Sequence, residues 1–265
     1  MEKDIIISKD NEKIKSIKKL KDKKQRDILD EYIIEGLRLV EEAIIENAKI
    51  KNIIICDELF RLNNISKEIK KFIENYNNIY VSEKVFKSIS EVNSPQGIIA
   101  VIDKSNNKEE IDIKEDIIVV LDDIQDPGNI GTIVRTLDSI GLKQVIISQN
   151  TVDIYNPKVV RSTMGAIFRI NVIRKENLVE TLEKLKEKDF KVMVTSPNTD
   201  KIIYDVDYEK KVIVIGNEGN GVRKSIIDIA DEKVKIPMIG KSESLNASVA
   251  TGIVLYEYVR RKVGK

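Results

Sequence analysis

Short apolar runs rich in β-branched residues alternate along the chain with stretches of helical periodicity. This alternation is typical of α/β proteins, and the continuously apolar runs suit parallel strands that are covered on both faces. The predicted strands are residues 52–56, 79–82, 97–102, 116–122, 144–148, 191–196, 211–216 and 233–237. The predicted helices are residues 28–48, 66–76, 129–141, 156–164, 175–189, 221–230 and 245–261. The pattern therefore predicts an α/β fold.

The segment 103–116, DKSNNKEEIDIKED, interrupts this alternation because it is polar and lacks periodicity. Such a segment predicts a linker between domains. The chain has 265 residues, which is enough for two modest domains with a sizeable buried core. We therefore predict a first domain over residues 1–107 and a second domain over residues 108–265.

The composition is that of a globular protein, with 34% charged and 42% hydrophobic residues. The net charge is only +1, so any surface for nucleic acid must come from local clustering of basic residues. No apolar run approaches the roughly 20 residues that span a bilayer. The N-terminal stretch MEKDIIISKD is too charged for a secretory signal. We expect a cytoplasmic protein that does not enter membranes.

The chain contains no histidine and a single cysteine, Cys56. These absences exclude Ser-His-Asp triads, Cys-His dyads, histidine-bound zinc and an intrachain disulfide. Cys56 ends the apolar run NIIIC, and we predict that it is a small buried hydrophobic residue. Any chemistry must use arginine, lysine, carboxylate, amide or hydroxyl groups, or the backbone, and we expect no metal.

The segment 13–26, KIKSIKKLKDKKQR, carries eight lysine or arginine residues and one aspartate. Such a segment is either a solvated helix face or a patch that contacts phosphates. Aromatic residues do not interleave with the basic ones, so stacking on bases is not indicated. The residues that would contact RNA are Lys18, Lys19, Lys23, Lys24 and Arg26.

A first stretch with candidate chemistry, IQDPGNIGTIVRTLDSIGL, follows the predicted strand 116–122. Pro127 and Gly128 predict a turn, and Asn129 can cap the next helix. Gly131 allows close approach of backbone or ligand, and Arg135 lies more than a turn into the helix. On these residues alone, a plain strand-turn-helix with an exposed arginine explains the stretch equally well.

A second stretch, VIVIGNEGNGV at residues 212–222, ends a buried strand in a glycine-rich loop. Such loops present backbone amides at a helix start. The glycine spacing is GxxGxG, which differs from the dinucleotide fingerprint and argues against a nicotinamide-dependent dehydrogenase. The carboxylate of Glu218 disfavours a phosphate, and a ligand with a positive centre fits better.

A third stretch, KVKIPMIGKSESLNASVATGIVLYEYVRR, predicts a short strand, a loop and a helix. We predict Ser244 as the residue that caps the helix. Apolar residues keep helical spacing on one face, and small residues thin the helix so that a ligand or a neighbouring element can pack closely. The apolar residues are Leu245, Val249, Ile253 and Tyr256, and the small ones are Ala247, Ala250 and Gly252.

Taken together and in this order, the three stretches resemble the three motifs of the SpoU (TrmH) family of SPOUT RNA methyltransferases. The matching strings are NIGTIVRT, VIVIGNEGNGV and IPMIGKSESLNASVATGIVLYE, and the resemblance covers residues 115–265. Residues 1–102 resemble the accessory substrate-binding domain of the family, a small α/β module related to RNA-binding ribosomal proteins. The strings that carry this second resemblance are IIEGLRLVEEAI and SPQGIIAVI.

The resemblance implies a SPOUT catalytic domain with a mainly parallel sheet and a deep C-terminal trefoil knot, an exception to the rule against knots. It implies S-adenosylmethionine as the cofactor, a ribose 2′-hydroxyl of RNA as the methyl acceptor, and a homodimer. The two-domain layout and the lysine-rich N-terminus favour ribosomal RNA over tRNA, and DNA is not expected. The alternatives are a tRNA 2′-O-methyltransferase, a methyltransferase acting on a base nitrogen, and a SPOUT-like protein that binds RNA without catalysis.

The resemblance also implies the site residues. The catalytic positions are Arg135, Asn129, Glu218, Ser244 and Asn246. The cofactor positions are Thr195, Ser196, Gly216, Asn217, Gly219, Ile236, Met238, Leu245, Asn246, Ala247 and Ser248. Arg135 matches the catalytic arginine of the family. Because a guanidinium with a pKa above about 12 is a poor base at neutral pH, we expect Arg135 to bind the adjacent phosphate and stabilise the developing oxyanion.

Overall fold

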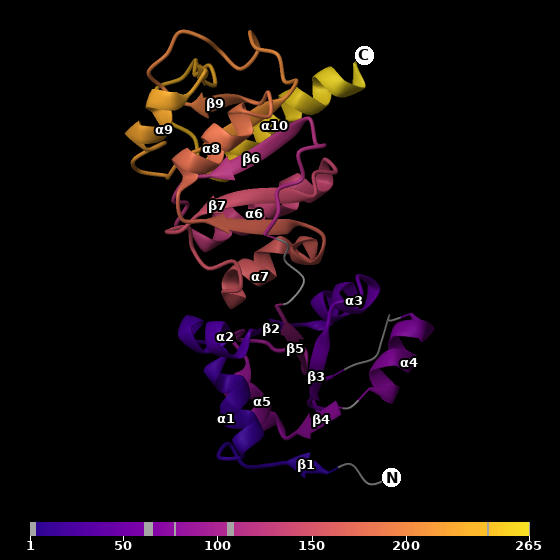
Figure 1. Cartoon of the computed structure of the whole chain (residues 1–265). Helices are drawn as coiled ribbons and strands as arrows, with labels where there is room; N and C mark the ends of the chain where they lie inside the picture. Colours follow the sequence, from indigo (N-terminus) through magenta and orange to yellow (C-terminus); the bar gives the residue numbers. More distant parts are fainter. Residues whose placement is uncertain (1–3, 61–65, 77, 105–108, 243, 265) are drawn as a thin grey trace. The chain divides into compact units, whose positions relative to one another are not determined.

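The computed structural model describes residues 4–60, 66–76, 78–104, 109–242 and 244–264. Contacts divide the chain into two compact units (Figure 1). The first unit comprises Met1–Asn106 and Asp153–Phe168, and the second comprises Asn107–Val152 and Arg169–Lys265. The chain therefore leaves the second unit at residue 153 and returns at residue 169. The sequence does not anticipate this excursion, and the assignment of functional domains to residues 1–107 and 108–265 stays a prediction.

The first unit contains a five-stranded mixed sheet in the order β1-β4-β3-β5-β2. The strands are β1 (Ile5–Ile6), β2 (Glu31–Glu35), β3 (Ile50–Ile55), β4 (Asn78–Val81) and β5 (Ile98–Asp103). The helices are α1 (Glu12–Lys19), α2 (Lys23–Leu29), α3 (Leu37–Ile45), α4 (Lys67–Asn75), α5 (Glu83–Ile89) and α7 (Pro157–Thr163), with the 3₁₀ helix η1 (Ala166–Phe168). Pairs β1/β4 and β3/β4 are parallel, and β5 pairs antiparallel with β2 and β3.

Both faces of this sheet are covered, which explains the continuously apolar strands. Ile53 and Ile55 of β3 belong to one hydrophobic cluster, whereas Ile54 belongs to another. Successive side chains of a strand point to opposite faces, so an apolar residue is needed at each of the three positions. Cys56 is buried in the second cluster, as predicted.

The predicted helix 28–48 is wrong, because the chain forms strand β2 and then helix α3 over these residues. Gly36 separates the two elements at a φ of 102°, in a backbone region that residues with a side chain rarely adopt. Within β2, Tyr32 and Ile34 belong to one hydrophobic cluster and Ile33 to the other, so the alternation is that of a strand buried on both faces.

The second unit contains a six-stranded sheet in the order β11-β9-β10-β6-β7-β8, and all its pairings are parallel. The strands are β6 (Ile117–Leu121), β7 (Gln144–Ser148), β8 (Asn171–Lys175), β9 (Lys191–Thr195), β10 (Lys211–Ile215) and β11 (Glu232–Val234). The helices are α6 (Pro127–Ser139), α8 (Leu178–Lys186), α9 (Lys224–Ile229) and α10 (Ala247–Val263). These elements confirm the predicted α/β fold with a mainly parallel sheet. No described helix meets the length and apolarity that crossing a membrane requires.

Helices cover the two faces of the parallel sheet. Val212 and Val214 of β10 pack with apolar residues of α8 and α9. Ile213 and Ile215, which alternate with them along the strand, are also buried. Helices α6 and α10 pack against each other. The sequence missed β8, whose outer residues Asn171 and Lys175 are polar, so only a short apolar run marks it.

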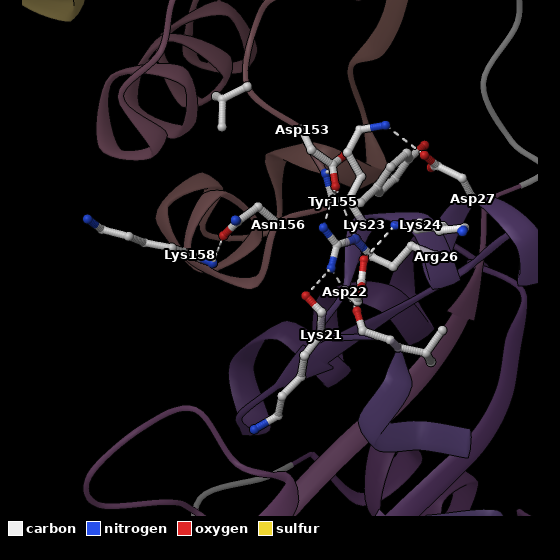
Figure 2. Close-up of polar contacts among 12 residues, drawn as sticks. Lys21, Asp22, Lys23, Lys24, Arg26, Asp27, Asp153, Tyr155, Asn156 and Lys158 are labelled. Carbon is white, nitrogen blue, oxygen red and sulfur yellow. Dashed lines mark hydrogen bonds and ion pairs between the residues drawn. The ribbon is translucent and has the colours of Figure 1, made fainter. Parts of the chain in front are cut away.

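Arg26 is buried in the first unit, with 2% of its surface exposed, so its predicted contact with RNA is wrong. Figure 2 shows its guanidinium directed at Asp153, with Nε and Nη2 donating to Oδ2 over 3.0 and 2.5 Å. Nη1 donates to the backbone carbonyls of Leu20 and Lys21 over 2.7 and 2.8 Å. Arg26 therefore joins the turn between α1 and α2 to the segment that begins at Asp153.

The segment from Asp153 to Phe168 is integral to the first unit. The Tyr155 ring lies 4.6 Å from the Tyr32 ring, measured between centroids. Lys104 Nζ lies over the Tyr155 ring, 5.0 Å from its centroid. Val160 and Ile167 belong to a hydrophobic cluster of the first unit. The segment is therefore held by a buried ion pair and by apolar packing.

We predict that Asp153→Ala strongly destabilises the first unit. The substitution leaves the Arg26 charge buried without its partner, which typically costs about 3–5 kcal/mol. Urea unfolding followed by circular dichroism measures the loss. The control is Asp10→Ala, which removes a carboxylate from the exposed pair with Lys15 and should change stability by less than about 1 kcal/mol. Equal unfolding midpoints for both variants would contradict the prediction.

Candidate functional site

A cleft of about 800 Å³ lies in the second unit at the carboxyl ends of strands β9 and β10. In parallel sheets these ends share one edge, which is where α/β proteins bind ligands. The cleft continues past the end of β11 to the start of α10. Predicted cofactor residues line it: Thr195, Ser196, Gly216, Asn217, Gly219, Ile236, Met238, Leu245 and Ala247. Glu218 and Ser244, predicted as catalytic, also line it.

The remaining predicted site residues do not line this cleft. Asn246 and Ser248 lie at the start of α10 and are tied to each other, because the Ser248 hydroxyl donates to Asn246 Oδ1 over 2.7 Å. Asn129 lies on α6 and is buried. Its side-chain amide donates to Glu218 of the cleft.

Residues 216–222 form a closed loop, here called the glycine loop. The backbones of Asn217 and Gly221 exchange two hydrogen bonds of 3.0 Å, and Gly221 has a φ of 68°. A Cβ on Gly216 would lie 2.1 Å from the carbonyl carbon of Gly221, so only glycine fits there. The spacing of these glycines therefore serves the closure of the loop. The predicted helix at 221–230 starts later, at α9, after Arg223.

Side-chain hydrogen bonds join the three polar site residues across elements far apart in sequence. Asn246 Nδ2 donates to Asn129 Oδ1 over 2.8 Å, and Asn129 Nδ2 donates to Glu218 Oε1 over 2.8 Å. The backbone amides of Gln125 and Asp126 point to the Glu218 carboxylate at 3.4 and 3.3 Å. The structure thus brings together α10, the start of α6 and the glycine loop.

The cap of helix α10 fixes the direction of these hydrogen bonds. Asn246 Oδ1 accepts from the amides of Ser248 and Val249 over 3.0 and 3.3 Å, so the amide group of Asn246 faces Asn129. Asn129 must then accept with its oxygen and offer its own amide group to Glu218. The predicted cap, Ser244, is wrong, because Asn246 performs this role and α10 begins at Ala247.

Glu218 is an exposed carboxylate at the cleft wall. Partial burial alone would raise its pKa, but hydrogen bonds from the Asn129 side chain and from the backbone amides of Asp126 and Gln125 hold the pKa below its usual value. Glu218 is therefore ionised at neutral pH. A negative charge at this position suits a ligand with a positive centre.

Arg135 lies on the exposed side of α6, away from Asn129. Its guanidinium makes no hydrogen bond or ion pair with any residue that the structure describes. The structure does not bring Arg135 into the hydrogen-bonded group of Asn129, Glu218 and Asn246. Its catalytic role stays a prediction.

Sequence reasoning missed Asp122, Asp123 and Arg223, which hold the glycine loop. Asp122 is fully buried at the end of β6, and its carboxylate accepts from the backbone and side chain of Arg223. The Asn217 side chain donates to the backbone carbonyl of Asp123 over 2.8 Å. The available signal was the pair of aspartates directly after an apolar strand, since such a position lies at the edge of the sheet where ligands bind.

The parallel sheet and the cleft at its carboxyl edge define an α/β protein that binds its ligand at the ends of the strands. Residues 116–256 match the SpoU rRNA Methylase family, and residues 11–100 match the MRM3-like substrate binding domain. The chain therefore belongs to the SpoU rRNA methylase family of RNA methyltransferases, which confirms the resemblance seen in the sequence and the predicted enzyme class.

Individual relatives extend the similarity over almost the whole chain. The chain is 34% identical over 252 residues to the 23S rRNA (guanosine(2553)-2′-O)-methyltransferase RlmP of Bacillus subtilis, covering 95% of this chain and 97% of that protein. A crystal structure of an RNA 2′-O ribose methyltransferase is 27% identical, with a TM-score of 0.83 over 98% of this chain and all of that one. The AdoMet-bound rRNA methyltransferase of Sinorhizobium meliloti is 29% identical, with a TM-score of 0.84 over 98% of both chains.

We predict that Asn246→Asp reverses the Asn129 amide. An aspartate keeps the cap of α10 but cannot donate to Asn129, so Asn129 turns its amide group towards residue 246 and its oxygen towards Glu218. The Glu218 pKa should therefore rise. In the wild type, the lowered pKa makes Glu218 contribute stability above the unfolded pKa, and this contribution is lost as pH falls through the folded pKa. In the variant, the part of this loss that comes from Glu218 should be smaller.

A carbon NMR titration of the Glu218 carboxyl measures this change. Asn246→Ser is the second variant, because serine caps a helix without adding a charge, and it separates the loss of the donor from electrostatic repulsion. Ser248→Ala is the control, since it removes a contact to Asn246 but leaves the direction of the amides unchanged. An unchanged Glu218 pKa in Asn246→Asp would show that the direction of the Asn129 amide does not control Glu218.

Proposed function

We propose that this chain transfers a methyl group from S-adenosylmethionine to a ribose 2′-hydroxyl of ribosomal RNA. The observation that carries the proposal is the cleft, which gathers most of the predicted cofactor residues beside the ionised carboxylate of Glu218. The similarity to RlmP, a 23S rRNA 2′-O-methyltransferase, and to an RNA 2′-O ribose methyltransferase supports a ribose 2′-hydroxyl as the acceptor. The AdoMet-bound Sinorhizobium meliloti enzyme supports the cofactor.

The residues of the cleft fit this cofactor. Its volume of about 800 Å³ lies in the usual range for small-molecule sites. Met238, Leu245 and Val222 supply apolar surface, and the exposed backbone of the glycine loop supplies polar groups close to a bound ligand. When bound, S-adenosylmethionine supplies a methyl group that its positive sulfonium makes electrophilic, and Glu218 offers the complementary charge. This chemistry requires no metal.

The protein's part in the reaction is positioning and electrostatic stabilisation. Asn129, Glu218, Ser244 and Asn246 orient the acceptor ribose, and Arg135 holds the adjacent phosphate and stabilises the developing oxyanion. Because Arg135 lies on the exposed side of α6, the RNA must approach that side of the helix. Val249 and Tyr256 of α10 are 51% and 54% exposed, and we propose that a second copy of the chain covers them in a homodimer. The proposal includes the deep trefoil knot and a cytoplasmic location.

The RNA surface of the first unit consists of Lys18, Lys19, Lys23 and Lys24, without Arg26. Lys19, Lys23 and Lys24 are exposed on α1 and α2, and Lys18 is partly exposed. The substrate-binding family match at residues 11–100 supports this assignment. Lys23 pairs with Asp27 over 2.6 Å, so RNA must compete with that carboxylate for it.

The function is tested by incubating the protein with labelled S-adenosylmethionine and either ribosomal RNA or tRNA, and by mapping the methylated positions. The expected product is 2′-O-methylated ribosomal RNA, with cofactor binding unchanged in excess EDTA. Preferential labelling of tRNA would favour the alternative acceptor, and methylation of a base nitrogen would overturn the ribose assignment. RNA binding without methyl transfer would indicate a binding protein.

We predict that Arg135→Lys lowers single-turnover methyl transfer and that Arg135→Ala lowers it further. Lysine keeps the charge but loses the planar group that binds a phosphate through two hydrogen bonds. Removing one preorganised donor to an oxyanion typically costs about a hundredfold in rate. Cofactor affinity should be unchanged, because Arg135 does not line the cleft. If wild-type activity titrates with one group and Arg135→Ala abolishes that titration, Arg135 acts as a base and the electrostatic role is wrong.

We predict that changing Lys18, Lys19, Lys23 and Lys24 together to glutamate weakens RNA binding and reduces its dependence on salt. The slope of log K against log salt is negative. Each lost phosphate contact makes it less negative by about 0.7 to 0.9. Filter binding at several salt concentrations measures the slope, and calorimetry with S-adenosylmethionine should give the wild-type affinity. The control replaces the exposed Lys184 and Lys188 of the second unit with glutamate. Equal slopes for both variants would assign the four lysines to an ordinary solvated surface.

A further inference from the structure

The glycine loop lines the cleft. The backbone hydrogen bonds within it join Asn217 to Gly221 and do not attach the loop to the rest of the unit. Ile215, Gly216 and Val222 stand at the two ends of this loop and all line the cleft. A shift of either end would move a wall of the cleft, including Glu218. The group that holds both ends in place therefore controls the shape of the site.

Asp122, at the end of the neighbouring strand β6, contacts both ends of the loop. Its backbone amide donates to the carbonyl of Ile215 over 2.8 Å. Its Oδ2 accepts from the backbone amide of Arg223 over 2.8 Å, and its Oδ1 accepts from Arg223 Nε over 2.7 Å. Arg223 Nη2 lies 2.6 Å from the same Oδ1 and completes the ion pair. One residue thus fixes the chain before the glycine loop and after it.

The Asp122 side chain is fully buried, whereas the Arg223 side chain is 42% exposed. Burial of a carboxylate is unfavourable unless the charge is paired and hydrogen-bonded, and an apolar residue would fill the same space without that penalty. Arg223 also occupies the capping position of α9, but it makes no side-chain cap. The capping of α9 therefore does not explain the ion pair. The contacts of Asp122 are instead with the residues that flank the glycine loop, Ile215 and Arg223.

We propose that Asp122 and Arg223 are positioning residues that hold the glycine loop in the conformation that binds the cofactor. Neither residue lines the cleft, so they act through the loop and not by contact with the ligand. The adjacent Asp123 supports the same loop, because its backbone carbonyl accepts from the Asn217 side chain over 2.8 Å. This inference rests on the proposed function for the identity of the ligand, but the mobility of the loop can be measured without any ligand.

The test uses the full chain with Arg223→Ala, Arg223→Lys and the neutral double variant Asp122→Asn/Arg223→Gln. Lys224→Ala is the matched control, because it removes the exposed cation at the next position. Hydrogen exchange of the Asn217 and Gly221 amides measures opening of the loop. Calorimetry with S-adenosylmethionine measures its dissociation constant, and thermal unfolding measures overall stability.

In Arg223→Ala we expect exchange at Asn217 and Gly221 to quicken by about tenfold and the dissociation constant to rise at least about tenfold. Arg223→Lys should restore part of both, and Lys224→Ala should match the wild type. Arg223→Ala could unfold because Asp122 loses its partner. In that case the same measurements are made on the neutral double variant, which leaves no uncompensated charge. It should show the same rapid exchange and weakened binding.

Wild-type exchange and wild-type affinity in the folded double variant would overturn the proposal and leave the ion pair a contributor to stability alone. Wild-type affinity despite rapid exchange would overturn it too, because the loop would then be free to move without loss of binding. If the wild-type protein does not bind S-adenosylmethionine, the proposed function fails. The exchange measurement still decides whether Asp122 and Arg223 hold the loop.

Discussion

The cap of helix α10 is the interaction on which the polarity of the site depends. A helix start leaves backbone amides without partners, and Asn246 satisfies two of them with its only side-chain oxygen. Its amide group is then committed to Asn129, and Asn129 in turn to Glu218. A requirement of secondary structure thus determines which atom faces the carboxylate. No additional charged group is needed to keep Glu218 ionised at the wall of the cleft.

A second constraint comes from the parallel sheet. Strands β6 and β10 are neighbours, so the chain leaves both at the same edge, although their ends are almost a hundred residues apart in sequence. The loops that follow can therefore bond directly: the Asp122 carboxylate holds Arg223, and the amides of Gln125 and Asp126 point to Glu218. The buried apolar strands form the base of the site. The polar side chains lie in the loops that follow these strands at the same edge of the sheet.

The sequence predicted best what depends on local pattern. Continuous apolar runs bounded by polar residues located β6, β7 and β10 almost to the residue. Two of the three motifs, VIVIGNEGNGV and the stretch that begins at Ile236, located most of the residues of the cleft. It failed where distant partners or backbone conformation decide. The break at Gly36 depends on a positive φ, and Ser244 and Asn246 are equally good caps by residue type. Arg26 looked like one more surface cation because its partner, Asp153, is 127 residues away.

Helix geometry separates Arg135 from the hydrogen-bonded group of Asn129. The two residues are six positions apart on α6, and at about 100° per residue they point to different sides of the helix. Asn129 is accordingly buried and Arg135 exposed. The proposed role of Arg135 therefore requires that the substrate, or another copy of the protein, extend around the helix to its exposed side. RNA is large enough to do so. The proposed role of Arg135 is thus compatible with a macromolecular acceptor and not with a small molecule confined to the cleft.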